Sequence, residues 1–184
     1  MDHPVSVALW AFSQRFISQW QDEGWAYPLS DVVADLDSLC VQSHVDHSVA
    51  WLPVSRETVH PLTAVETGME LVLQDDIHAY YGSQWAADMT AMWNDQTITL
   101  LQAFNEDDLS GLQENILGHL VSQRRFKVKP TVFIAALENE QQVISVCNLT
   151  GNVLLETLGK KGNREVIATE LSDFLVKLTP VVVR

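Results

Sequence analysis

Residues 57–123 contain no lysine and no arginine, although acidic residues recur through this stretch. The first 123 residues carry 18 acidic side chains against only Arg15 and Arg56, a net charge of −16. Residues 124–184 carry nine basic and six acidic side chains, a net charge of +3. Most of such a surface would repel nucleic acid and anionic lipid headgroups and attract a cationic partner. An acidic surface also keeps a protein soluble. Net charge alone is therefore better explained by solubility than by a binding partner.

Cysteine and long apolar runs are equally scarce. The only cysteines, Cys40 and Cys147, lie far apart and form no CxxC motif, which predicts reduced thiols in a cytosolic protein and no structural zinc site. No uncharged apolar stretch is long enough to cross a membrane. The first ten residues have neither a basic segment nor a small-residue cleavage site, so we expect no secretory signal.

The short motifs of common enzymes are absent as well. There is no GxGxxG, P-loop, GxSxG or HExxH pattern. His44 and His47 with Asp46 between them are too few to predict a metal site, which needs three or four convergent ligands. Adjacent acids such as Asp75 and Asp76 cannot face each other across a sugar, as glycosidase carboxylates must. We therefore expect no catalytic residue, no metal and no cofactor.

Apolar spacing predicts a helix at the start of the chain. Val5, Leu9, Phe12, Phe16 and Trp20 fall on one face, and the nearly cation-free polar face indicates a core-packing helix, not a membrane anchor. After it, we expect an irregular segment over 25–47, a strand over 48–54, a short helix opened by a capping box at 63–66, and an undetermined segment over 71–87.

The second half has clearer signals. Residues 87–104 predict a hairpin that turns at Asn94 and Asp95. A helix then begins after Asn105, strands follow over 130–137, 143–149 and 153–158, and a final helix is capped by Asn163. This order predicts an α+β fold, a single domain over residues 1–184 with a largely antiparallel sheet flanked by helices.

The central helix brings several acids to its first turn. Glu106, Asp107 and Asp108 stabilise the positive end of the helix dipole, and Arg124 and Arg125 suit the negative end. This explains the order of charges within the helix, but it does not explain the cation-free stretch around it. We infer an acidic face over several elements, whose internal repulsion a cationic partner would relieve.

The region around this helix resembles a known family. Residues 99–159 closely resemble the Syd family of SecY-interacting proteins, and weaker similarity covers nearly the whole chain. The strings that carry the resemblance are NEDD at 105–108, QENILGHL at 113–120, VISVCNL at 143–149, ETLG at 156–159, AVE at 64–66 and IHAYYGSQWAADM at 77–89.

The resemblance implies a fold of the SMI1/KNR4-like (SUKH) superfamily and a protein without catalytic activity or cofactor. It implies a cytoplasmic protein on the cytoplasmic side of the bacterial inner membrane, where basic loops of SecY bind to an acidic concave face. Contact with the membrane would be indirect, through the SecYEG translocon, which the protein would monitor or negatively regulate. No nucleic acid is implied as a partner.

The partner-binding role is carried over only to acids within the matching strings. These are Glu66, Asp88, Glu106, Asp107, Asp108 and Glu114. Two alternatives remain open. One is an immunity-like protein of the SUKH type that neutralises a basic toxin, and the other is a hydrolase or metal enzyme that uses the same acids with His78 or His119. The enzyme alternative requires carboxylates that converge in a closed pocket.

Overall fold

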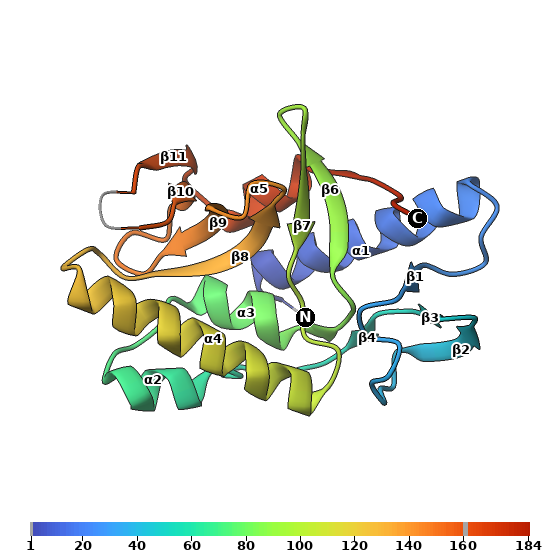
Figure 1. Ribbon diagram of the computed structural model, residues 1–184, viewed down its shortest axis with the longest axis horizontal. Coiled ribbons are helices and arrows are strands. Elements are labelled where there is room, and N and C mark those ends of the chain that lie inside the picture. The colour runs from blue at the N-terminus through green and yellow to red at the C-terminus, as the bar shows by residue number, and fades with distance from the viewer. Residues whose placement is uncertain (1, 160–161) are drawn as a thin grey trace.

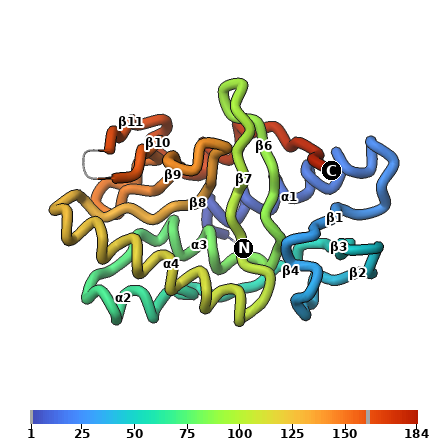
Figure 2. Tube along the Cα trace, in the orientation of Figure 1, coloured from blue at the N-terminus to red at the C-terminus, as the bar shows by residue number. Residues whose placement is uncertain are grey.

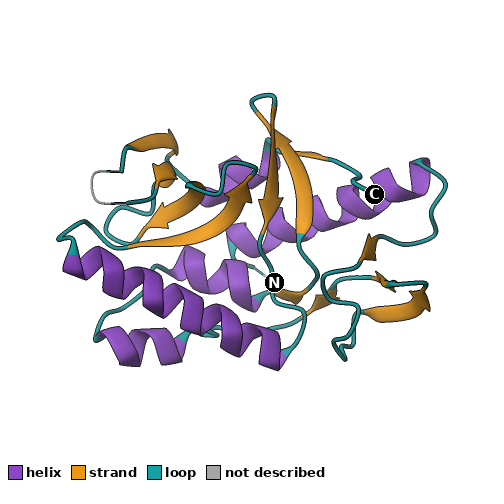
Figure 3. Cartoon of the chain, in the orientation of Figure 1, coloured by secondary structure: helices purple, strands orange, loops and turns teal. Residues whose placement is uncertain are grey.

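The computed structural model describes residues 2–159 and 162–184, and its centre is a curled seven-stranded antiparallel sheet (Figure 1, Figure 3). The strand order is β11-β10-β9-β8-β7-β6-β12. In Figure 1, α1 and α5 lie behind this sheet, and α2, α3 and α4 run along its lower side. The expected α+β fold with a largely antiparallel sheet is therefore confirmed.

The bounds of the helices are as follows: α1 Pro4–Asp22, α2 Thr63–Met69, α3 Asp75–Gly82, α4 Glu106–Arg125 and α5 Leu171–Val176. The strands of the large sheet are β6 Met89–Trp93, β7 Gln96–Leu100, β8 Thr131–Leu137, β9 Gln142–Cys147, β10 Val153–Thr157, β11 Arg164–Ala168 and β12 Thr179–Pro180. Within residues 2–159 and 162–184, five further strands lie outside it: β1 Leu29–Ser30, β2 Val41–Val45, β3 Ser48–Trp51, β4 Val54–Ser55 and β5 Gln84–Trp85.

The amphipathic first helix is confirmed. Helix α1 buries the predicted face, with Leu9 and Phe12 fully enclosed, and packs mainly against α5. The ring Nδ1 of His3 accepts a hydrogen bond from the Val5 amide and caps the helix start. Gly24, with a φ of +93°, follows the helix end, where a left-handed residue favours glycine.

The segment from residue 25 to residue 55 differs from expectation. Residues 41–45, expected to be irregular, form β2, which pairs with β3 around a turn at Asp46 with a φ of +53°. Because most of β2 is exposed on both faces, its sequence shows no alternation of apolar and polar residues. The strand expected over 48–54 is split into β3 and β4 around Leu52 and Pro53.

The capping box expected at α2 is also wrong. Leu62 is the N-cap and forms no side-chain bond, so Thr63 is already inside the helix. The undetermined segment that follows forms α3 and β5. At Gly82, the end of α3, an added Cβ would lie 2.3 Å from the Thr58 carbonyl oxygen, so this close backbone approach requires glycine.

The hairpin and the central helix are confirmed. Strands β6 and β7 pair around Asn94 and Asp95, whose φ values of +45° and +62° match the expected tight turn. The Asn105 Oδ1 accepts a 2.7 Å hydrogen bond from the Asp108 amide and caps α4. The helix buries Leu109 and Ile116 against the rest of the core.

The last predicted helix is partly wrong. Residues from Arg164 to Ala168 form β11, which pairs with β10, and helix α5 begins only at Leu171. The apolar residues Val166 and Ile167 are compatible with a helix or with a strand. This segment forms a strand because it pairs with β10 at the edge of the sheet. Across residues 2–159 and 162–184, no helix is both long and apolar enough to cross a membrane.

Candidate functional site

An open groove lies beside the start of α4, with a volume of about 720 Å³. Its two walls are the chain before β2 and the segment that leads into α4. We call this depression the acidic groove, and it is lined by Leu36, Asp37, Ser38, Leu39, Val41, His44, Trp85, Phe104, Asn105, Glu106 and Asp107. Figure 2 shows that these two parts of the chain, distant in sequence, lie side by side.

Two hydrogen bonds join the walls of the acidic groove. The Asn105 side-chain amide donates to the Asp37 carbonyl oxygen at 2.7 Å, so the residue that caps α4 also holds the opposite wall. The Ser38 hydroxyl donates to the Phe104 carbonyl oxygen at 2.6 Å and accepts from the Cys40 amide at 3.1 Å. The groove is therefore built by tertiary contacts and not by one segment alone.

The acids of the groove keep most of their charge available to a partner. Asp37, Glu106 and Asp107 are all exposed. Glu106 lies 3.9 Å from the guanidinium of Arg56, but 80% of its side chain is exposed, so this pair is weak. Arg56 instead stacks 3.5 Å from the ring centre of Trp85. The rim of the groove is therefore negatively charged with little internal compensation.

The floor of the groove is apolar. Phe104 is fully buried, Leu36, Val41 and Trp85 are half-buried, and Leu39 is 77% exposed at the edge. A groove with an acidic rim and an apolar floor suits an extended or helical segment that carries both basic and apolar side chains.

The acidic surface continues from the groove onto the small sheet. A neighbouring depression of about 270 Å³ is lined by residues that include Asp31, Asp35 and Asp46, and it shares His44 with the groove. The sequence directed attention to acids between residues 66 and 114, so Asp37 and these three were missed. Within residues 2–159 and 162–184, no group of three or more histidine, cysteine or acidic side chains is placed to hold a metal ion.

Of the six predicted residues, only Glu106 and Asp107 line the groove. Asp108 points back instead, and its Oδ2 accepts a 2.8 Å hydrogen bond from the Phe104 amide. The Asp88 Oδ1 likewise accepts a 2.7 Å hydrogen bond from the Gln102 amide. Together Asp88 and Asp108 hold the segment that forms the floor and wall, so we assign them a positioning role.

Asp88 also has an altered acidity. Desolvation raises the pKa of Asp88, the hydrogen bond from Gln102 lowers it, and the nearby Asp108 carboxylate raises it, so that the net pKa lies above the ordinary value. The residue keeps more than a third of its surface exposed, and water there screens the repulsion between the two carboxylates.

Glu66 and Glu114 lie outside the groove. Glu114 is exposed on α4, two turns beyond the groove. The Glu66 Oε2 accepts a 2.8 Å hydrogen bond from the Leu73 amide, and its Oε1 lies 3.3 Å from Nε2 of the buried His78. Desolvation raises the pKa of Glu66, but the bond from Leu73 and the neighbouring His78 outweigh it and hold the pKa below its ordinary value.

The lowered pKa of Glu66 gives a stability prediction. A carboxylate with a depressed folded-state pKa stabilises the fold above its ordinary value of 4.5, and this is lost as the pH falls through the folded-state pKa. We expect Glu66→Gln to lower the free energy of unfolding by about 1 kcal/mol at neutral pH, and by less at about pH 3, which lies below the ordinary pKa. Urea denaturation at the two pH values measures it. Glu114→Gln is the matched control and should change nothing, and an equal loss at both pH values for Glu66→Gln would contradict the assignment.

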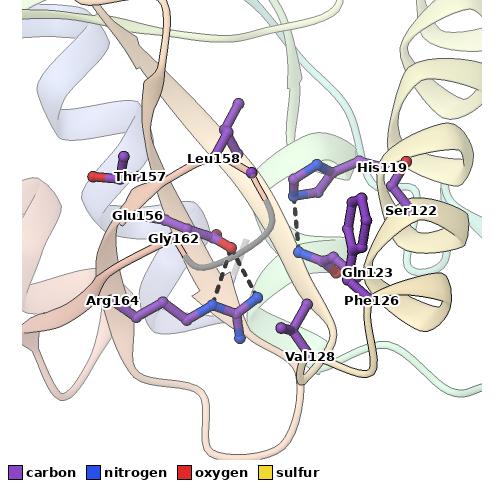
Figure 4. Close-up of a pocket in the computed structure, with 11 residues that line it drawn as sticks. His119, Ser122, Gln123, Phe126, Val128, Glu156, Thr157, Leu158, Gly162 and Arg164 are labelled. Carbon is purple, nitrogen blue, oxygen red and sulfur yellow. Dashed lines mark hydrogen bonds and ion pairs between the residues drawn. The ribbon is translucent and has the colours of Figure 1, made fainter.

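Another depression, of about 240 Å³, lies between the end of α4 and strands β10 and β11 (Figure 4). The buried Glu156 receives two bonds from Arg164, at 2.8 and 3.1 Å, and one from the Thr131 hydroxyl at 2.8 Å. Gln123 joins Thr131 to the ring of His119, at 2.6 and 2.9 Å.

The polar side chains of this depression are engaged with one another. Desolvation lowers the pKa of His119, with Glu156 opposing that shift and Arg164 adding to it. Both oxygens of Glu156 are engaged by Arg164 or Thr131, so this carboxylate is not placed as a free base. The network instead ties the end of α4 to the sheet.

Sequence comparisons with known proteins identify the family of this chain. The family model described as "Syd protein (SUKH-2)" matches residues 6–180. "Protein Syd" of Photobacterium profundum is 47% identical over 182 residues, 99% of this chain and 98% of its own. "Protein Syd" of Cronobacter sakazakii is 45% identical over 182 residues, 99% of this chain and 100% of its own. "Protein Syd" of one strain of Aliivibrio fischeri is 44% identical over 181 residues, 97% of this chain and 98% of its own.

The fold and the groove thus define an α+β protein with an open acidic surface built around the start of a long helix. The coverage and identity of these matches are high over nearly the whole chain. The chain belongs to the Syd family.

Proposed function

We propose that the acidic groove binds a basic cytoplasmic segment of SecY, and that this chain thereby monitors or restrains the SecYEG translocon. The observation that carries the proposal is the weakly compensated acidic rim of Asp37, Glu106 and Asp107 above an apolar floor. The family resemblance supplies SecY as the partner. The cytoplasmic loops of membrane proteins are enriched in lysine and arginine, so their charge is complementary to the groove.

Binding would proceed in two stages. The net charge of −13 and its concentration in the first 123 residues would attract a basic loop and raise the association rate. Apolar side chains of the loop would then contact Leu39 and Val41, which limits dissociation. No step of this mechanism needs a cofactor or bond chemistry, and it places the chain on the cytoplasmic side of the inner membrane through its partner.

The six acids carried over from the resemblance divide between two roles in this proposal. Glu106 and Asp107 would face the partner directly, with Asp37 added to them. Asp88 and Asp108 would act indirectly by holding the segment between β7 and α4. Glu66 and Glu114 would lie outside the contact.

Salt dependence tests the proposal. We expect the Kd for purified SecYEG in nanodiscs to rise about tenfold between about 0.05 M and about 0.3 M salt, since exposed charges are screened over a shorter distance at higher salt. Binding is measured by fluorescence titration with labelled chain, with empty nanodiscs as the control. A Kd that is the same at both salt concentrations would rule out electrostatic docking.

A further inference from the structure

The far end of α4 has the opposite charge from its start. Residues 115–137 contain no acid, and four of the 11 basic residues of the protein fall within 124–129. We call residues 121–129 the basic tip. Its cations are Arg124, Arg125, Lys127 and Lys129, and its apolar residues are Val121, Phe126 and Val128.

Most cations of the basic tip are not used by the fold. Arg124 donates to the Met69 carbonyl oxygen at 2.7 Å and closes the end of α2. Arg125, Lys127 and Lys129 are exposed, and their side chains form no hydrogen bond or ion pair with any residue that the structure describes. Their charges are therefore available to a partner.

The backbone of the basic tip adopts a conformation that favours glycine, but the chain has Lys127 there. The Val128 amide bonds to the Gln123 carbonyl at 3.0 Å and the Lys127 amide to the Arg124 carbonyl at 3.2 Å, which closes the helix in a Schellman motif. Lys127 occupies the left-handed position with a φ of +57°, where glycine is usual and a side chain is strained. The backbone at the helix end therefore does not require the Lys127 side chain.

The basic tip is apolar as well as basic. Val121 is 43% exposed, Phe126 45% and Val128 38%, and Phe126 and Val128 alternate with cations. Cations interleaved with aromatic and aliphatic side chains suit the boundary between lipid headgroups and acyl chains. A nucleic acid backbone would leave these valine side chains without an apolar partner.

The position of the basic tip limits repulsion by the rest of the chain. Helix α4 has 20 residues and is about 30 Å long, so the tip and the acidic groove lie at opposite ends of this helix (Figure 1). The Debye length in physiological salt is about 8 Å, so the acids of the groove are largely screened at the tip.

We propose that the basic tip binds the anionic phospholipid headgroups of a bilayer directly. Lysine and arginine side chains would contact the phosphates, and Phe126 and Val128 would enter the headgroup layer. This is a second contact, independent of the acidic groove.

Vesicles without protein test this contact on its own. We expect the full chain to co-sediment with vesicles of phosphatidylcholine and phosphatidylglycerol in equal parts, and not with phosphatidylcholine alone. Lys127→Gln/Lys129→Gln should weaken this binding by about 30-fold, since each cation near the surface contributes about fivefold. Lys177→Gln/Arg184→Gln removes the same charge elsewhere and should bind as the original chain does.

Further outcomes separate the proposal from its rivals. Phe126→Ser should reduce vesicle binding while the free energy of unfolding stays nearly the same, because this side chain is 45% exposed. Equal weakening by both charge variants, or no binding to anionic vesicles, would overturn the proposal. Tighter binding to a short DNA duplex or to polyglutamate would assign the basic tip to another class of partner. Because SecYEG is absent, failure here leaves the acidic groove untested, and the two proposals fail separately.

Discussion

Glu106→Lys/Asp107→Lys should weaken binding to SecYEG about 100-fold while the chain remains folded. Both side chains are exposed on the rim of the acidic groove, so their reversal turns two attractions into two repulsions. At up to about 1 kcal/mol for each exposed pair, and a similar amount for each repulsion, the change amounts to about 3 kcal/mol. Lysines at a helix start also oppose the dipole, so we expect the free energy of unfolding to fall by about 1 kcal/mol.

The matched control is Asp22→Lys/Asp173→Lys. It changes the net charge equally, both side chains are exposed outside the groove, and Asp173 also occupies the first turn of a helix. Fluorescence titration with SecYEG nanodiscs compares the two variants, and urea denaturation verifies folding. If both variants lose affinity equally, the net charge of the whole protein attracts the partner, and the acidic groove is not the binding site.

Glu156→Ala should lower the free energy of unfolding by about 3–5 kcal/mol. The carboxylate is only 4% exposed, and it holds both Arg164 and the Thr131 hydroxyl. Removing one partner of a buried ion pair leaves the other charge uncompensated and leaves the hydroxyl without its acceptor. Urea denaturation at neutral pH measures the loss.

A second substitution separates the charge from the packing. Glu156→Ala/Arg164→Ala removes both charges, so it should lose less stability than the sum of the two single variants. Arg124 also lies at this end of α4, but it is exposed, so Arg124→Gln should cost about 1 kcal/mol or less. A loss below about 1 kcal/mol for Glu156→Ala would show that the network does not hold α4 to the sheet.

The elements that sequence patterns predicted are those whose signals are local. Helix α1 has an uninterrupted apolar period, and the β6–β7 hairpin has a turn whose two residues accept positive φ. Strand β2 is almost wholly exposed, so the apolar alternation that marks a strand is missing. The apolar spacing of strand β11 is also compatible with a helix, and its pairing with β10 makes it a strand. Pairing with the neighbouring strand decides these two cases.

The site was predicted in part for a similar reason. Sequence places Glu106, Asp107 and Asp108 in one helical turn, but which of them faces outward depends on the amide of Phe104, which only Asp108 reaches. Asp88 likewise binds the Gln102 amide through the fold. Asp37 was missed because the segment before β2 offers no periodic signal, and only the tertiary contact through Asn105 brings it to the groove.

The two hydrogen bonds across the acidic groove have a consequence for the thermodynamics of recognition. Asn105 and Ser38 join walls that are 68 and 66 residues apart in sequence, so the groove has its shape before a partner arrives. Little conformational entropy is then lost by this chain on binding, and the ordering cost falls on the incoming segment. A loop that is already helical or held at both ends would therefore bind more tightly than a free peptide of the same sequence.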